Sequence, residues 1–165
     1  MLVNVMATYS HPQPALSTVA PFKSIEVNGM TFLWMFNGGL LRCEASAPTT
    51  GWVAVGFNTQ NELRGTNLIM GAIEQEFLNM DDQYIVKPGD HRSVIQLGGS
   101  EALTKRGGKE EDGITTISFS LPQLANDKFH HNLIQGVEYY VLLAFSQEDD
   151  FKHHSIMRTT IKLKL

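Results

Sequence analysis

From Ser24 to the C-terminus, hydrophobic residues occur in short runs separated by turn residues, and no long segment has them spaced for a helix. Asn28-Gly29 and Asn37-Gly38-Gly39 separate the first three runs. Asn-Gly pairs accept the positive φ angles of tight hairpins. The sequence therefore predicts three consecutive antiparallel strands, at residues 24–27, 30–36 and 40–47.

The later hydrophobic runs predict strands of different kinds. Residues 51–57 and 67–73 are apolar at both parities, which is typical of strands covered on both faces. In residues 115–121 the side chains of Ile117, Phe119 and Leu121 alternate with polar ones, so we expect one buried and one wet face.

The C-terminal third predicts two more strands, and a glycine-rich segment predicts a loop. EYYVLLAFS, at 138–146, is expected in the interior of a sheet. TIKLKL, at 160–165, alternates with exposed lysines, which suits an edge strand. Lys87–Gly113 contains three glycine turn signals and is expected to be mostly loop.

About ten short strands with glycine-rich connections predict an all-β fold, a two-layer antiparallel β-sandwich of immunoglobulin-like type. Residues 22–165 are expected to form this single domain. Three prolines, the last of them Pro21, predict that residues 1–21 are an extended N-terminal leader.

Composition narrows the function classes. The chain has 165 residues with 13 Lys and Arg against 17 Asp and Glu, a net charge of −4, which offers no broad cationic face for nucleic acid. Cys43 is the single cysteine, so intramolecular disulfides, cysteine-based zinc clusters and a Cys-x-x-Cys-His attachment for covalent haem are excluded, and we expect a core thiol. No apolar run has the length of a membrane span, and the N-terminal residues lack the features of a signal peptide.

Two histidine pairs are the most noticeable polar feature. His130-His131 lies in a polar connection and is expected to be solvated. His153-His154 follows the acidic Asp149-Asp150 pair between the last two strands, where one ring can turn toward an end of the sandwich. Adjacent side chains of an extended segment point to opposite faces, so one member of this pair is the better candidate for a ligand.

The chain has no motif of an independent enzyme. A nucleophile elbow, a phosphate-binding glycine loop, a zinc-binding helix and a paired-carboxylate arrangement are all missing from the sequence. Trp34 and Trp52 lie in apolar strands and are expected in the core rather than on a sugar-binding surface. We therefore predict a binding or electron-transfer module without its own catalytic centre.

From about Ile25 onward the order and spacing of several segments resemble the DOMON domain family, whose fold is similar to the cytochrome domain of cellobiose dehydrogenase and to family 9 carbohydrate-binding modules. The segments that carry this resemblance are FLWMF, APTTGWVAVGFN, LRGTNLIMGAI, the Asp81-Asp82-Gln83-Tyr84 stretch, HRSVIQLGG, ITTISFSLPQL and GVEYYVLLAFSQEDDFKHHSIMR. The resemblance implies an extracytoplasmic domain, whether secreted, periplasmic or on the cell surface. Such a domain binds haem b for electron transfer, with a redox partner protein, or binds a saccharide.

Haem-binding members of this family use a methionine and a histidine as axial ligands. By resemblance the histidine is in the His153-His154 pair, with His154 as the ligand of the haem iron. The methionine position holds Leu63, and leucine cannot ligate iron. His91 or Met70 could replace the missing ligand, although core packing is the expected role of Met70, and a third alternative is haem held by one ligand.

An apolar slot for the porphyrin is expected between the aromatic and aliphatic residues near these positions: Trp52, Phe57, Leu63, Leu68 and Phe151. Two alternatives to haem remain open at this point. One is a non-catalytic module for a carbohydrate or another small molecule. The other is a protein-interaction domain whose ligand site has decayed, which Leu63 at the methionine position would be consistent with.

Overall fold

The computed structural model describes residues 21–165, and the predicted leader, residues 1–21, lies outside this range except for its last residue. Eleven strands and no helix make up the described chain: β1 (Lys23–Val27), β2 (Met30–Asn37), β3 (Leu40–Ala47), β4 (Val53–Asn58), β5 (Asn67–Glu74), β6 (Phe77–Lys87), β7 (Asp90–Ser93), β8 (Thr104–Glu111), β9 (Ile114–Pro122), β10 (Glu138–Phe145) and β11 (Met157–Lys164). Accordingly, residues 21–165 contain no helix that is long and apolar enough to cross a membrane.

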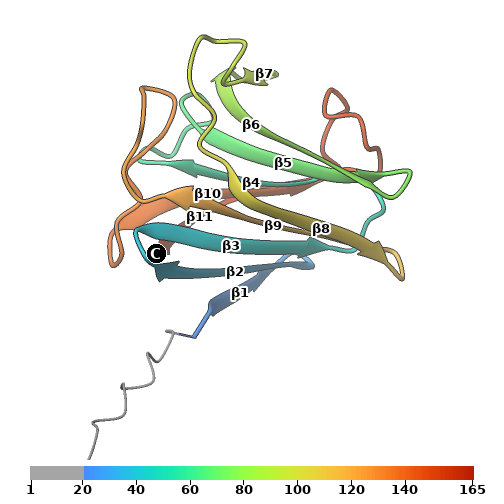
Figure 1. Cartoon of the computed structure of the whole chain (residues 1–165). Coiled ribbons are helices and arrows are strands. Elements are labelled where there is room, and N and C mark those ends of the chain that lie inside the picture. Colours follow the sequence, from blue (N-terminus) through green and yellow to red (C-terminus); the bar gives the residue numbers. More distant parts are fainter. Residues whose placement is uncertain (1–20) are drawn as a thin grey trace, which may run out of the picture.

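Two antiparallel sheets face each other without closing into a barrel (Figure 1). One sheet has the order β1-β2-β3-β9-β8, and the other has the order β11-β10-β4-β5-β6-β7. The predicted all-β, two-layer antiparallel sandwich is confirmed.

The core between the sheets comes from the alternation of side chains along the strands. The inward residues of β9, namely Ile117, Phe119 and Leu121, are buried as their parity predicts. They pack with inward residues of the other strands, among them Phe32 and Phe57. Burial of these aromatic and aliphatic side chains supplies the main driving force for folding.

Several local predictions are confirmed. The first three strands and their Asn-Gly turns form as expected, with Asn28 and Gly29 at positive φ. β10 lies inside its sheet between β11 and β4, and β11 is an edge strand with exposed lysines. Cys43 is buried in β3, and burial raises the pKa of its thiol.

The loop expected over Lys87–Gly113 is wrong in part, because this segment contains β7 and β8. β8 has the sequence TKRGGKEE and is almost entirely exposed. Its backbone pairs with β9 at the edge of the sheet. A strand held by main-chain hydrogen bonds, with few buried side chains, carries no hydrophobic alternation for sequence analysis to detect.

Candidate functional site

The outer face of the six-stranded sheet carries a second hydrophobic cluster, separate from the core between the sheets. It arises because β4, β5 and β10 are apolar at both parities, so that they bury one set of side chains inward and present another outward. Its buried members are Trp52, Ala54, Leu68, Met70, Ala72, Ile85, Leu142 and Ala144, with Leu63 and Phe151 packed against them. We call this set the outer cluster.

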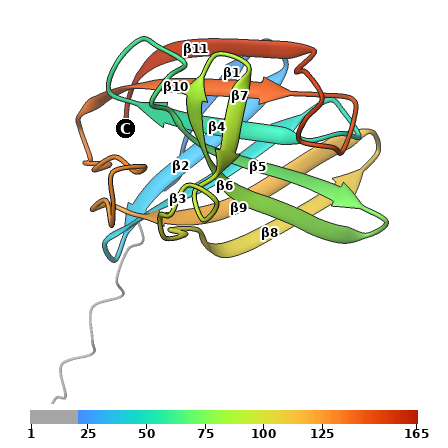
Figure 2. The same ribbon diagram turned by 90° about the horizontal axis from the view of Figure 1, so that it is seen from above.

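A pocket lies over the outer cluster, with an empty volume of about 660 Å³, part of which is open to solvent. Two segments form its walls: the β6–β7 hairpin with Gly89, Asp90 and His91, and the connection from β10 to β11 with residues 152–155. Both segments rise above the six-stranded sheet (Figure 1), and in Figure 2 the β6–β7 hairpin lies over β4 and β10. An apolar floor with a few polar groups at the rim is typical of a small-molecule site.

Six of the predicted site residues line this one pocket: Trp52, Leu63, Met70, His91, His153 and His154. They come from five separate parts of the chain. Phe151 packs against the outer cluster but lines a neighbouring groove. The tertiary structure thus brings together residues that the sequence offered as separate candidates.

Phe57 does not line the pocket, contrary to its predicted place in the apolar slot. It is fully buried between the sheets, where its ring lies 6.4 Å from that of Phe32. Successive side chains of β4 alternate, so Trp52 and Ala54 face outward while Val53, Val55 and Phe57 face the core. Trp52 is buried as expected, but in the outer cluster rather than between the sheets.

His91 is the most enclosed of the three pocket histidines. It is partly buried on β7, and its Nδ1 is hydrogen-bonded to Oε1 of Gln83 on β6. Burial lowers the pKa of His91, although the charges of Asp90 and Asp81 act in the opposite direction. At neutral pH the ring is therefore uncharged and keeps one nitrogen lone pair.

His153 and His154 are exposed in the connection between β10 and β11. Nδ1 of His153 lies 3.4 Å from a carboxylate oxygen of Asp150. The backbone carbonyl of His154 accepts a 3.0 Å hydrogen bond from the Ser146 hydroxyl, which ties the connection to the end of β10. The imidazole of His154 makes no hydrogen bond to any residue in the range 21–165.

Two cations stand at the rim of the pocket. Lys152 and Arg158 both line it, and neither forms an ion pair with another residue of the described chain. An apolar floor beneath unpaired cations suits a ligand with an apolar body and anionic groups at its edge.

A polar groove adjoins the pocket, and His91 and Lys152 line both. Its acidic side chains include Glu74, Asp81 and Asp149. Asp149 is partly buried, and this burial together with the charge of Glu74 raises its pKa. Within residues 21–165, however, no three His, Cys, Asp or Glu side chains are arranged to hold a metal ion.

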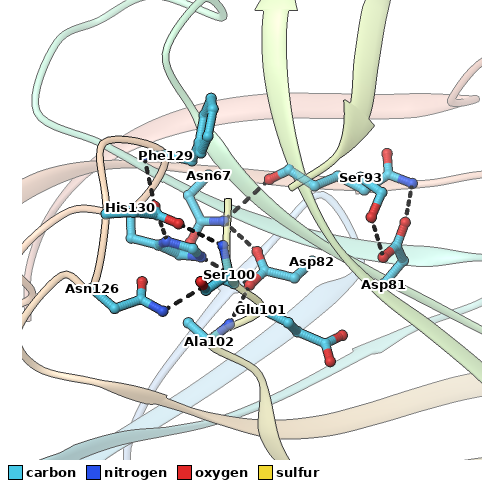
Figure 3. Close-up of polar contacts among 12 residues, drawn as sticks. Asn67, Asp81, Asp82, Ser93, Ser100, Glu101, Ala102, Asn126, Phe129 and His130 are labelled. Carbon is cyan, nitrogen blue, oxygen red and sulfur yellow. Dashed lines mark hydrogen bonds and ion pairs between the residues drawn. The ribbon is translucent and has the colours of Figure 1, made fainter. Parts of the chain in front are cut away.

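His130 is buried, and the prediction of a solvated His130-His131 pair is wrong for this residue. Its Nε2 lies 2.9 Å from Asp82 and its Nδ1 lies 2.7 Å from Asp127 (Figure 3). Asp82 also accepts hydrogen bonds from Asn67 Nδ2 at 2.7 Å and from the Ala102 amide at 2.9 Å. We call His130, Asp82 and Asp127 the histidine clasp. None of the three residues lines the pocket.

Comparisons with solved structures give two similar folds. The chain is similar to the cytochrome b domain of pyranose dehydrogenase from Coprinopsis cinerea, with a TM-score of 0.66, 10% identity, and coverage of 86% of this chain and 80% of that one. It is also similar to the cytochrome domain of cellobiose dehydrogenase from Myriococcum thermophilum, with a TM-score of 0.57, 6% identity, and coverage of 86% and 77%. A comparison with curated proteins found no significant match.

The sequence also matches a family model. The model of the DOMON domain matches residues 26–146, nearly three quarters of the chain, and covers the strands from β2 to β10, among them β4, β5 and β10 of the pocket floor. The chain therefore belongs to the DOMON domain family.

Proposed function

We propose that this domain binds haem b non-covalently in the pocket over the outer cluster and serves as an electron-transfer module. The observation that carries the proposal is the convergence of His91, His153 and His154 on one apolar pocket. The two similar structures are cytochrome domains, which supports the same ligand class.

The donor set of the pocket fits haem. Imidazole nitrogens are axial ligands of haem iron, and His154 and His91 would hold the metal from the two walls. Leu63, at the methionine position of the family, lines the pocket and offers only apolar contact. When bound, haem b supplies a reversible one-electron iron couple.

The remaining pocket residues would bind and shield the group. Leu68, Met70 and Leu142 form an apolar floor that excludes water from one face of a planar ligand. Arg158 and Lys152 would pair with carboxylates at the ligand edge. Without covalent attachment, the affinity for haem would depend on these contacts and on the histidine nitrogens that hold the iron.

The proposal includes an extracytoplasmic location, a redox partner protein and the absence of a catalytic centre in this domain. These follow the family resemblance. The haem proposal is tested against two alternatives. In one the domain binds a saccharide, and in the other it binds partner proteins and no small ligand.

The test is a haemin titration of the purified protein, followed by its absorption spectrum. We expect a sharpened Soret band on binding, and at least a tenfold loss of affinity in His154→Ala because an axial nitrogen is removed. His131→Ala is the matched control, since His131 bonds the Gly65 carbonyl away from the pocket. A haemin spectrum unchanged by the protein would rule the proposal out, and saccharide binding seen by calorimetry in that case would favour the alternative.

A further inference from the structure

A chain of hydrogen bonds leads from Ser93 to the pocket histidine. The Ser93 hydroxyl donates to Oδ1 of Asp81 at 3.2 Å (Figure 3), and Nε2 of Gln83 donates to Oδ2 of Asp81 at 3.0 Å. Oε1 of Gln83 then faces Nδ1 of His91. The strands place these groups together, because Gln83 pairs with Ser93 across β6 and β7, and Asp81 and Gln83 are two residues apart on one face of β6.

The chemistry of these groups determines which atom donates and which accepts in each hydrogen bond. An ionised carboxylate only accepts hydrogen bonds, so Asp81 requires the NH₂ end of the Gln83 amide. The carbonyl end of the amide must then face His91, and a carbonyl oxygen also only accepts. Nδ1 of His91 is therefore the donor, and the lone pair of the neutral ring is on Nε2.

His91 forms the wall between the polar groove and the apolar pocket. Asp81 and Gln83 line the groove and not the pocket, so the Nδ1 side of the ring is engaged from the groove. Nε2 makes no hydrogen bond to any residue of the described chain. Metal-binding histidines use this arrangement, in which the second ring nitrogen donates to an oxygen that sets the tautomer and the orientation of the ring.

We infer that Asp81 and Gln83 are positioning residues that hold His91 as the Nδ1–H tautomer, with Nε2 as a ligand atom for the iron of the group bound in the pocket. The role of Nε2 as an iron ligand rests on the proposed function. The tautomer itself does not, because it is a property of the ligand-free protein.

Asp81→Asn is the sharpest variant, because it has nearly the same shape and reverses the direction of the chain. An asparagine can accept from Ser93 through its oxygen and donate to Gln83 through its nitrogen. The Gln83 amide then turns its NH₂ end toward His91, which favours the Nε2–H tautomer. Asp90→Asn is the control, since it removes a charge next to His91 but none of these hydrogen bonds.

The first measurement is the tautomer of His91 in the ligand-free protein, from long-range ¹H–¹⁵N correlation spectra at neutral pH. We expect a protonated Nδ1 in the wild type and in Asp90→Asn, and a shift toward protonated Nε2 in Asp81→Asn. A wild type with protonated Nε2, or an Asp81→Asn spectrum equal to that of Asp90→Asn, would overturn the inference.

The second measurement is haemin affinity and the spin state of the bound iron. We expect Asp81→Asn to bind haemin about 10–100-fold more weakly, as for other changes behind a metal ligand, with loss of the low-spin spectrum. Glu74→Gln removes a carboxylate from the same groove and should behave as the wild type. Unchanged affinity and spin state in Asp81→Asn would overturn the ligand role of His91. Absence of haemin binding in the wild type, with the tautomer as expected, would overturn the proposed function and leave the positioning of His91 standing.

Discussion

His130 connects parts of the chain that are far apart in sequence. Its ring lies between Asp82 on β6 and Asp127 in the connection from β9 to β10, and its side chain is only 5% exposed. Asp82 is 1% exposed, so removal of the imidazolium would leave a buried carboxylate without its cation. Breaking such a pair costs about 3–5 kcal/mol.

The clasp predicts a pH dependence of stability. Burial opposes the charged form of His130, but the hydrogen bonds and charges of Asp82 and Asp127 outweigh it and raise the pKa of the folded state. A raised folded pKa gives stability that is fully present below the unfolded pKa, about 6.5, and is lost as the pH rises through the folded value. We expect the wild type to lose up to about 1.4 kcal/mol per pH unit in this window, and His130→Gln to lack this loss.

Urea unfolding at a series of pH values measures this effect. The difference between the two proteins isolates His130, because the other histidines contribute to both curves. His131→Gln should keep the wild-type dependence, since His131 bonds a backbone carbonyl and no carboxylate. Parallel curves for the wild type and His130→Gln would show that folding does not raise the pKa of His130.

The two histidine pairs show the limit of prediction for single residues. Both pairs lie in polar connections, and no local pattern indicates that His130 is buried while His153 and His154 are exposed. The carboxylates that bind His130 are 48 and 3 residues away, and only folding brings them together. His91 was a candidate from its loop, whereas its partner Gln83 had no assigned role.

At the scale of elements, the segment just before β4 and the segment just after β10 lie so close together that only glycine fits at position 51. A Cβ atom on Gly51 would lie 2.5 Å from backbone atoms of residues 146–148. Two backbone hydrogen bonds of 3.0 Å stabilise this contact. The Trp52 amide donates to the Glu148 carbonyl, and the Ser146 amide donates to the Trp52 carbonyl. The same segment leads into the connection that carries His153 and His154.

Gly51→Ala is therefore expected to destabilise the fold by about 1–3 kcal/mol, the usual cost of forcing an extra group into a packed site, and to displace the histidine connection. Urea unfolding gives the stability, and amide chemical shifts of residues 147–156 report the displacement. Thr50→Ala, at an exposed neighbouring position, should stay within about 0.5 kcal/mol of the wild type. Equal behaviour of both variants would contradict the close approach.

Strands with an apolar run or a clear alternation were predictable, and β8, which has neither, was not. β4, β5, β9 and β10 are visible in the sequence as apolar runs or alternation. β8 has one partly buried residue among eight, so its existence depends on the backbone of β9 rather than on its own side chains.

For the whole molecule, the two hydrophobic clusters have separate tasks. The cluster between the sheets holds the sandwich together, and the outer cluster forms the floor of a pocket. A substitution in the cluster between the sheets should therefore lower the stability of the fold. A substitution in the outer cluster should lower the affinity for the ligand.

Phe57→Ala and Leu63→Ala test this separation. Phe57 is fully buried, so we expect its truncation to cost about 3–5 kcal/mol. Leu63 is half-buried at the pocket, and its truncation should cost about 1 kcal/mol. Haemin affinity should fall in Leu63→Ala. In Phe57→Ala it should equal that of the wild type, provided that it is measured under conditions in which the variant is folded. Urea unfolding and haemin titration of both proteins give the comparison, and a loss of affinity in Phe57→Ala alone would contradict it.

By itself, the sequence determined the all-β sandwich, most of its strands and the candidate histidines, because these depend on local alternation, turn residues and side-chain chemistry. The tertiary structure decided which candidates meet. It placed Phe57 in the core, His91 and His154 at one pocket, and His130 in a buried clasp. The physical reason is that strand register and loop packing join residues distant along the chain, and these contacts leave no periodic signal in the sequence.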